Sequence, residues 1–246
     1  GEMVLALAPI FLDKRFSAER SKAGLKLLEQ LARKAVSVAG TPDAGIWEYR
    51  KEWRPQTFSS LMCWAAADRM SRVAALHAPS LEIEFRSAAE RIREEIITKS
   101  WNPQLGCFVG TYGGDNLDAS LLQMVSLRFL PPDDFRLQAT IEAIRKGLAR
   151  DGWLLRYRTD DGFGKPTVAF VIATFWLVEA LAAIGLNKEA KQVMEQAHSA
   201  LSPLGLLSED YETTTLRMWG NFPQAYSHVG LIHAAYAASP RWSEIL

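Results

Sequence analysis

Two glutamates lie in long, aromatic-rich connecting segments, and their immediate neighbours differ in polarity. Glu48 stands between Trp47 and Tyr49, whereas Glu209 follows Ser208 in a more polar run. An apolar neighbour desolvates a carboxyl group and raises its pKa, as a general acid near neutral pH requires, while a polar setting keeps a carboxylate ionised. Two carboxyl groups in unlike environments are the working parts of glycoside hydrolysis.

The same segments collect aromatic residues, which is unusual because connecting loops are mostly polar. Two interpretations remain open: the rings pack onto the rim of the core, or they line a pocket and stack on the apolar faces of sugar rings. The residues concerned are Trp47, Trp53, Trp101, Trp153 and Trp219, with Tyr49, Tyr112, Tyr157 and Tyr211.

Other chemically capable residues have simpler explanations. His228 begins an apolar segment and is read as a hydrogen-bonded core or rim histidine, and His233 has no acidic or histidine partner at helical spacing. Ser59 and Ser60 fit a helix cap better than a nucleophile, because no His/Asp constellation accompanies them. We therefore expect no metal site and no cofactor.

The elements that must position Glu48 and Glu209 are helices, because apolar residues recur at three- and four-residue spacing. Two kinds of predicted helix alternate along the chain. One kind is apolar on most faces and must be buried nearly all round, and the other is amphipathic, with one face in water. The first kind comprises 2–12, 57–77, 117–130, 167–185 and 222–238, and the second comprises 16–38, 80–99, 134–150 and 187–201.

This alternation predicts an inner ring of helices wrapped by an outer ring, an all-α, α/α toroid. The long connections, near 39–56, 100–116, 151–166 and 202–221, all run from an outer to an inner helix, so they share one face. Long ordered loops are usually functional, which places Glu48 and Glu209 on one rim. We treat residues 1–246 as a single domain that lacks about three helices on its N-terminal side.

Bulk composition excludes several classes of partner. The net charge is +0 and the pI is about 7.1, so neither nucleic acid nor an acidic tail is indicated. The most apolar stretch, 168–185, contains Thr174 and Glu179 and is read as a core helix rather than a membrane span. Cys63 and Cys107 are predicted to be buried free thiols in a reducing compartment. With no signal peptide evident at the N-terminus, we expect a cytoplasmic protein.

Three stretches together resemble glycoside hydrolase family 15. They are Gly-Ile-Trp-Glu-Tyr-Arg at 45–50, Thr-Phe-Ser-Ser-Leu-Met-Cys-Trp-Ala-Ala at 57–66, and Gly-Asn-Phe-Pro-Gln-Ala-Tyr-Ser-His at 220–228 behind Ser208 and Glu209. Segments 117–122 and 175–181 also fit, so the resemblance covers essentially the whole chain. The family includes glucoamylases, glucodextranases and some bacterial trehalases.

The resemblance implies an (α/α)6 barrel and an inverting mechanism. Glu48 would be the general acid and Glu209 the general base, with carboxyl groups roughly 6.5–9.5 Å apart to admit a water. Arg156 is similar to a family arginine that binds sugar hydroxyls, and Trp47 would stack on the leaving-group side. We also expect Tyr211 and Trp219 to bind substrate.

The function expected from this resemblance is an exo-acting glucoamylase that releases glucose from oligosaccharides. Two alternatives stay open: an α,α-trehalase with the same catalytic pair, and a non-catalytic helical scaffold that binds glycan or protein. The Arg-Asp pair that grips glucose in the family's first helical third has no counterpart here, nor has the β-sandwich of many bacterial members. Because catalysis depends on substrate positioning, we expect weak or no activity from this chain alone.

Overall fold

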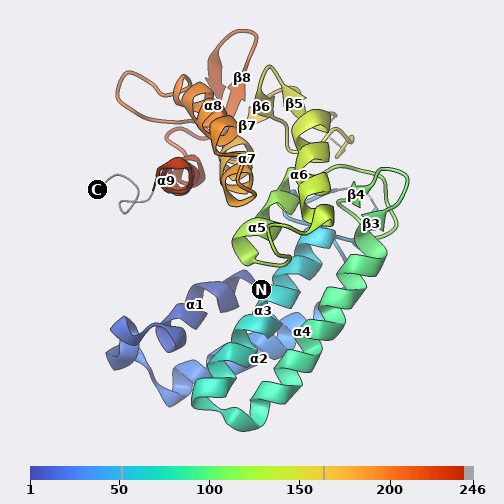
Figure 1. The fold of residues 1–246 in the computed structure, drawn as a ribbon, viewed down its shortest axis with the longest axis vertical. Helices are drawn as coiled ribbons and strands as arrows, with labels where there is room; N and C mark the ends of the chain where they lie inside the picture. The colour runs from blue at the N-terminus through green and yellow to red at the C-terminus, as the bar shows by residue number, and fades with distance from the viewer. Residues whose placement is uncertain (51, 163, 241–246) are drawn as a thin grey trace. The chain divides into compact units, whose positions relative to one another are not determined.

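The computed structural model describes residues 1–50, 52–162 and 164–240, which are mostly helical (Figure 1). The predicted helices are confirmed, with shorter bounds at several ends. They are α1 (Glu2–Leu12), α2 (Lys22–Val38), α3 (Thr57–His77), α4 (Pro79–Ser100), α5 (Gln123–Leu127), α6 (Phe135–Gly147), α7 (Val171–Ala183), α8 (Asn187–His198) and α9 (Ala225–Ala238), with 3-10 turns η1 (Lys14–Glu19) and η2 (Ala119–Leu122).

The chain divides into two compact units. The first comprises Gly1–Trp101 with Thr111–Gly114, and the second comprises Asn102–Gly110 and the chain from Asp115 onward. Each unit has its own buried residues, so each is described by itself. The expectation that residues 1–246 form one domain stays a prediction.

In the first unit, α3 packs against α1, α2 and α4. Its small residues Ala65, Ala66 and Ala67 are fully buried, which lets the neighbouring helices approach closely. The amphipathic α2 turns Leu28 and Ala32 inward and leaves its charged residues outside. The predicted difference between a buried and an amphipathic helix is confirmed for α3 and α2. The prediction that 2–12 is buried nearly all round is wrong, because only Val4, Ala8 and Phe11 of α1 are buried.

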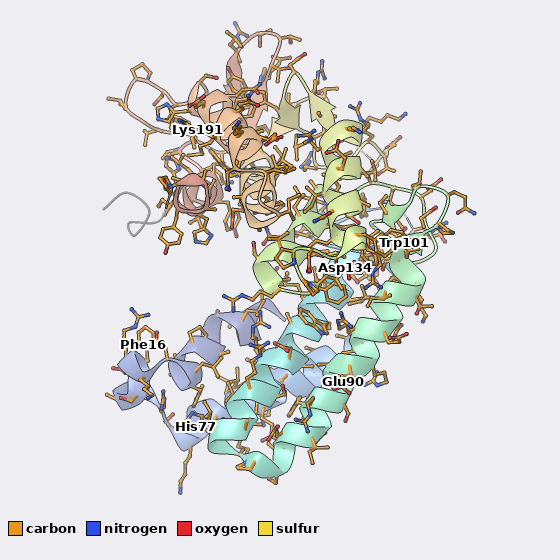
Figure 2. The ribbon with its side chains drawn as sticks, in the orientation of Figure 1. Phe16, His77, Glu90, Trp101, Asp134 and Lys191 are labelled. Atoms are coloured by element: carbon orange, nitrogen blue, oxygen red, sulfur yellow. The ribbon has the colours of Figure 1, made fainter. Side chains whose placement is uncertain are left out.

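The ends of α1 and α3 are joined through His77, which is labelled in Figure 2. One ring nitrogen of His77 lies 2.8 Å from the carbonyl oxygen of Phe11, and the two rings meet edge to face with centroids 5.8 Å apart. This pair holds the last turn of each helix against the other.

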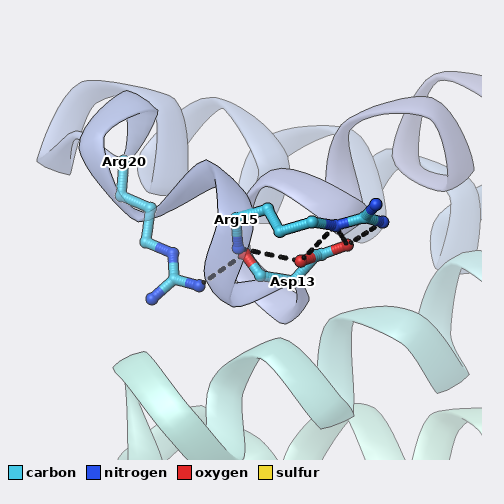
Figure 3. A network of polar contacts seen from close by, with 3 residues as sticks. All are labelled: Asp13, Arg15 and Arg20. Atoms are coloured by element: carbon cyan, nitrogen blue, oxygen red, sulfur yellow. Dashed lines mark hydrogen bonds and ion pairs between the residues drawn. The ribbon is translucent and has the colours of Figure 1, made fainter.

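Between α1 and α2 the chain departs from the predicted helix 16–38. Asp13 accepts hydrogen bonds from the backbone and the guanidinium of Arg15, and Arg20 Nη2 donates to the Asp13 carbonyl at 2.9 Å (Figure 3). These bonds close the 3-10 turn η1, so α2 starts only at Lys22, with Ser21 Oγ accepting from Gly24 N at 3.0 Å as its N-cap.

In the second unit, α7 packs against both α8 and α9 and is buried over most of its surface. The predicted helix 117–130 is shorter than expected. Asp118 caps the 3-10 turn η2, and the short α5 ends at Leu127, because the next residue, Arg128, has a left-handed φ of 59°.

Short antiparallel ladders occupy the long connections and the adjoining ends of the predicted helices 134–150 and 167–185, and the sequence did not predict them. A ladder of two or three residues is too short to leave an alternating apolar pattern. β1 pairs with β2, β5 with β6, and β8 lies between β7 and β9. The strands are β1 (Pro42–Asp43), β2 (Arg54–Pro55), β3 (Trp101–Asn102), β4 (Cys107–Phe108), β5 (Ala149–Arg150), β6 (Trp153–Leu154), β7 (Ala169–Phe170), β8 (Asp210–Glu212) and β9 (Arg217–Trp219).

The prediction that 222–238 is buried nearly all round is wrong. One face of α9 packs on α7 through small residues, but large apolar side chains elsewhere on this segment are exposed, because no described helix covers them. They are Phe222, Tyr226, Val229, Ile232 and Tyr236, with exposures of 52%, 67%, 48%, 65% and 87%.

Two smaller expectations are also resolved. Cys63 and Cys107 are free and buried, and burial raises the pKa of both thiols. None of the described helices is both long and apolar enough to cross a lipid bilayer.

Candidate active site

Glu48 lies in a tight turn between β1 and β2 in the first unit. Its amide N donates to the Gly45 carbonyl at 3.2 Å, and the Tyr49 amide donates to the Ala44 carbonyl at 2.8 Å. Glu48 itself has a φ of 54°, a left-handed conformation that costs a non-glycine residue roughly 1–2 kcal/mol. Strained backbone of this kind tends to gather at functional positions, although Arg128, Asp151 and Leu216 also have a positive φ.

The turn is held by Asp43, the last residue of β1. Its Oδ1 accepts from the Gly45 amide at 2.6 Å and from Ser59 Oγ at 2.8 Å. Ser59 belongs to the first turn of α3, so the hydrogen bond ties the loop to a buried helix. Ser59 therefore acts as an anchor for the loop rather than as the predicted helix cap.

The expected desolvation of Glu48 by its aromatic neighbours is not found. Trp47 and Tyr49 are half-buried, but Glu48 is exposed. Two rings flanking a residue in sequence do not cover its side chain when the backbone at that residue is turned into the left-handed region.

Glu209 lies immediately before β8 in the second unit and is half-buried. Its Oε2 accepts two hydrogen bonds from Asn221, one from the backbone N and one from Nδ2, both at 3.0 Å. Oε1 accepts no hydrogen bond from the described residues. One carboxylate oxygen is thus fixed, and the other is available to orient a water.

Gly220 makes this arrangement possible. Its φ is 75°, and a Cβ at this position would lie 2.7 Å from Glu209 Oε2 and 2.9 Å from Glu209 Cβ. The loop carrying Asn221 can approach the glutamate only because residue 220 has no side chain. The glycine of the Gly-Asn-Phe-Pro motif therefore has a direct physical purpose.

The three-stranded ladder next to Glu209 has one open and one closed face. Phe170, Asp210 and Trp219 are directly opposite one another across β7, β8 and β9, so their side chains share one face. All three are at least partly exposed, and Trp219 is 50% exposed. Trp219 Nε1 donates to Glu212 Oε2 at 3.3 Å, which holds the indole on this face.

Tyr211 points to the closed face and is a correction to the predicted site. Its side chain is only 5% exposed, and its ring packs on Trp153 with centroids 4.6 Å apart. A ring buried in this way cannot stack on a sugar. Because successive side chains of a strand alternate between faces, its neighbour Asp210 holds the open position instead.

Arg156 brings a cation to the open face. Its guanidinium lies 5.6 Å from the centroid of the Tyr157 ring and 5.7 Å from that of Phe170. The Arg156 side chain makes no hydrogen bond or ion pair with any described residue, although it is half-buried. Its N–H donors are therefore available to a ligand.

Asp210 is the residue at this site that the sequence analysis missed. Burial raises the pKa of its carboxyl group to about 6; Arg156 opposes this rise and the charge of Glu209 adds to it. Its Oδ1 is buried and accepts no hydrogen bond from the described residues. Perturbed carboxyl groups of this kind cluster at functional sites. Its position directly after the predicted base was the only signal in the sequence.

Asp210→Asn is expected to stabilise the chain at neutral pH. The folded-state pKa is raised above the ordinary value of 3.8, so the folded state holds the proton more tightly, and stability falls as pH rises from about 4 to about 6. The variant escapes this loss, which amounts to at most roughly 3 kcal/mol. Urea unfolding at pH 4 and pH 7.5 measures it. An equal difference between variant and wild type at both pH values would contradict the burial argument.

The predicted site residues thus lie in both units. Trp47 and Glu48 lie in the first, and Arg156, Glu209 and Trp219 lie in the second. Within the second unit, Asp210 is close enough to both Arg156 and Glu209 for their charges to affect its carboxyl group. Over the part of the chain that the structure describes, no cluster of His, Cys, Asp and Glu could hold a metal ion.

Curated proteins that are similar to this chain in sequence are named trehalase. The trehalase of Mycolicibacterium smegmatis is 40% identical over 232 residues, which cover 93% of this chain and 35% of the relative. That of Mycobacterium tuberculosis is 42% identical over 212 residues, covering 85% of this chain and 31% of the relative. The chain therefore spans about a third of the length of these relatives.

Solved structures share the fold at low sequence identity. A glycosidase in complex with glucose matches with a TM-score of 0.79 and 20% identity, covering 96% of this chain and 65% of that one. Hormoconis resinae glucoamylase matches with a TM-score of 0.75 and 13% identity, covering 96% and 51%. The predicted all-α, (α/α)6 fold class is thereby confirmed.

The family model described as "Glycosyl hydrolases family 15" matches residues 29–201, well over half of the chain. The match includes Glu48 and Arg156 and ends shortly before Glu209. Together with the trehalase relatives, it confirms the resemblance seen in the motifs: the chain belongs to glycoside hydrolase family 15.

Proposed function

We propose that this chain carries the catalytic glutamates of an inverting hydrolase whose substrate is α,α-trehalose. The observation that carries the hydrolytic assignment is the half-buried Glu209, with Oε2 fixed by Asn221 and with Oε1 accepting no hydrogen bond from the described residues. The choice of trehalose is supported by the names of the relatives that are 36% to 42% identical to this chain.

In the proposed reaction Glu48 is the general acid and Glu209 the general base. Glu48 gives its proton to the glycosidic oxygen as the bond to the anomeric carbon breaks, while Glu209 takes a proton from the attacking water. One glucose leaves with its anomeric configuration unchanged, and the other is released with inverted configuration. Arg156 and Trp219 would hold the sugar, and Trp47 would contact the leaving glucose.

A glucoamylase, which the motifs alone favour, is the second candidate. Its support is weaker, because the likeness to the Hormoconis resinae glucoamylase is 13% identical and bears on the fold alone. A non-catalytic scaffold has less support still, since family membership comes with both motif glutamates in place. The two buried free thiols favour a reducing, cytoplasmic setting for either enzyme.

We also retain the proposal that the barrel is incomplete without further helices. Two observations support it: the chain spans about a third of its relatives' length, and α9 leaves a row of large apolar residues uncovered. Weak activity of the isolated chain, with full activity in a longer protein that contains it, is the expected consequence.

Products from trehalose, maltose and isomaltose test the assignment. With trehalose, proton NMR in the first minutes is expected to detect α- and β-glucose in equal amounts, because inversion converts only one of the two sugars. Preference for maltose by tenfold or more in kcat/KM would select glucoamylase instead. Two α-glucose molecules from trehalose would contradict inversion, and a lack of turnover in the longer protein would contradict the hydrolase.

A further inference from the structure

The open face of the β7–β8–β9 ladder holds two opposite charges that are not joined by a direct contact. Asp210 Oδ1 is buried and accepts no hydrogen bond from the described residues, and the Arg156 guanidinium donates none to them. Their charges nevertheless affect one another. In a structural ion pair the two groups would lie within hydrogen-bond distance, because the favourable interaction energy of a charged pair is largest there.

We propose that Asp210 is a positioning residue, whose carboxyl group orients the Arg156 guanidinium so that its N–H donors face the hydroxyl groups of the sugar bound beside Glu209. This inference rests on the function proposed above.

The surroundings of Arg156 show why such a residue is needed. The rings of Tyr157 and Phe170 lie against the guanidinium and limit its tilt. The two rings do not fix how the guanidinium is rotated within its own plane. Fixing an arginine side chain also costs much rotamer freedom, so a further interaction is needed to hold it in one orientation. A carboxyl group directly opposite Phe170 in the ladder supplies that direction without occupying the donors.

The energetic cost of Asp210 points the same way. A carboxyl group with one buried oxygen that accepts no hydrogen bond from the described residues destabilises the fold, and an asparagine would fit the same space. Residues that reduce stability in this way are typical of sites where function opposes stability. A purely structural residue at this position would not need to be ionisable.

A double-mutant cycle on trehalose hydrolysis by the longer protein tests the proposal. Asp210→Asn is expected to raise KM about tenfold with kcat changed less than threefold, because an oriented charge-assisted contact to substrate is weakened. Asp210→Glu should recover most of this loss. In an Arg156→Gln background, Asp210→Asn should add less than a twofold effect, because the residue through which it acts is gone.

The pH dependence of kcat/KM distinguishes a positioning role for Asp210 from a purely structural one, which would leave this dependence unchanged. The wild type should have an inflection in kcat/KM near pH 6 that is absent from Asp210→Asn. Asp133→Asn makes the same chemical change at an exposed position before α6 and should match the wild type. An effect of Asp210→Asn that is equal in both Arg156 backgrounds, or a KM within twofold of wild type, would overturn the proposal.

Failure of the proposed function is recognised separately. If the wild type hydrolyses no α-glucoside but binds D-glucose, as measured by tryptophan fluorescence, the enzymatic assignment fails. The double-mutant cycle is then measured through the glucose dissociation constant. Asp210→Asn should raise this constant about tenfold in the wild type and less than twofold in the Arg156→Gln background. A wild type that neither hydrolyses α-glucosides nor binds glucose overturns both proposals.

Discussion

Glu209→Gln is expected to lower kcat for trehalose by a factor of about 10³, and Glu48→Gln by a similar factor, since each removes one half of the acid–base pair. Glutamine keeps the size of each side chain but can neither take a proton from water nor give one to the glycosidic oxygen. In the Glu209→Gln variant, Asn221 can still donate to the amide oxygen of the new side chain, so the fold around the base should be retained.

A second substrate separates the two roles. Fluoride leaves without protonation, so α-glucosyl fluoride should restore activity to Glu48→Gln but not to Glu209→Gln. Glu195→Gln, an exposed residue of α8, controls for the loss of a carboxylate and should match the wild type. Recovery of Glu209→Gln by the fluoride, or less than a tenfold loss in either variant with trehalose, would remove that residue from its assigned role.

Gly220→Ala is expected to reduce kcat/KM by about 10² while leaving most of the fold intact. Alanine is strained at a φ of 75°, and its Cβ would meet Glu209 at 2.7–2.9 Å, so either the glutamate or the Asn221 loop must move. Either movement breaks the two hydrogen bonds that fix Oε2 and misplaces the general base.

Gly205→Ala is the matched control for this variant. Gly205 has nearly the same φ, 74°, but nothing lies within 4 Å of its built Cβ. Both variants should lose about 1 kcal/mol of stability in thermal unfolding through backbone strain, and Gly220→Ala should lose more because of its contact with Glu209. Only Gly220→Ala should also lose activity. If both variants lose activity equally, the loss in Gly220→Ala does not come from a clash between the new Cβ and Glu209.

Helices were predictable from this sequence because long amphipathic and all-apolar segments leave strong periodic patterns. Segments 57–77 and 2–12 match α3 and α1 at both ends. The segment from 16 to 21 was misassigned, because local hydrogen bonds to Asp13 close a 3-10 turn that periodicity does not report. The apolar pattern of α9 also predicted burial on all sides. Burial depends on which elements pack against a helix, and the sequence of the helix alone does not determine this.

The site was predictable where residue type decides chemistry and was missed where strand direction decides it. Glu209 and Arg156 were proposed mainly through the resemblance of their motifs to the family, and Gly220 belongs to one of these motifs. The choice between Asp210 and Tyr211 depends on which way a three-residue strand faces, and one residue of register exchanges the two faces. The left-handed backbone of Glu48 likewise follows from the geometry of its turn, and no residue type in the motif predicts that geometry.

The uncovered row on α9 has a practical consequence in solution. Exposed large apolar side chains such as Tyr226, Ile232 and Tyr236 are expected to bind hydrophobic dyes and to promote association between molecules. Sulfate and phosphate strengthen apolar association because they are excluded from protein surfaces. Sedimentation of this chain should therefore shift toward larger species as ammonium sulfate is added, and kinetic measurements belong in dilute chloride buffers.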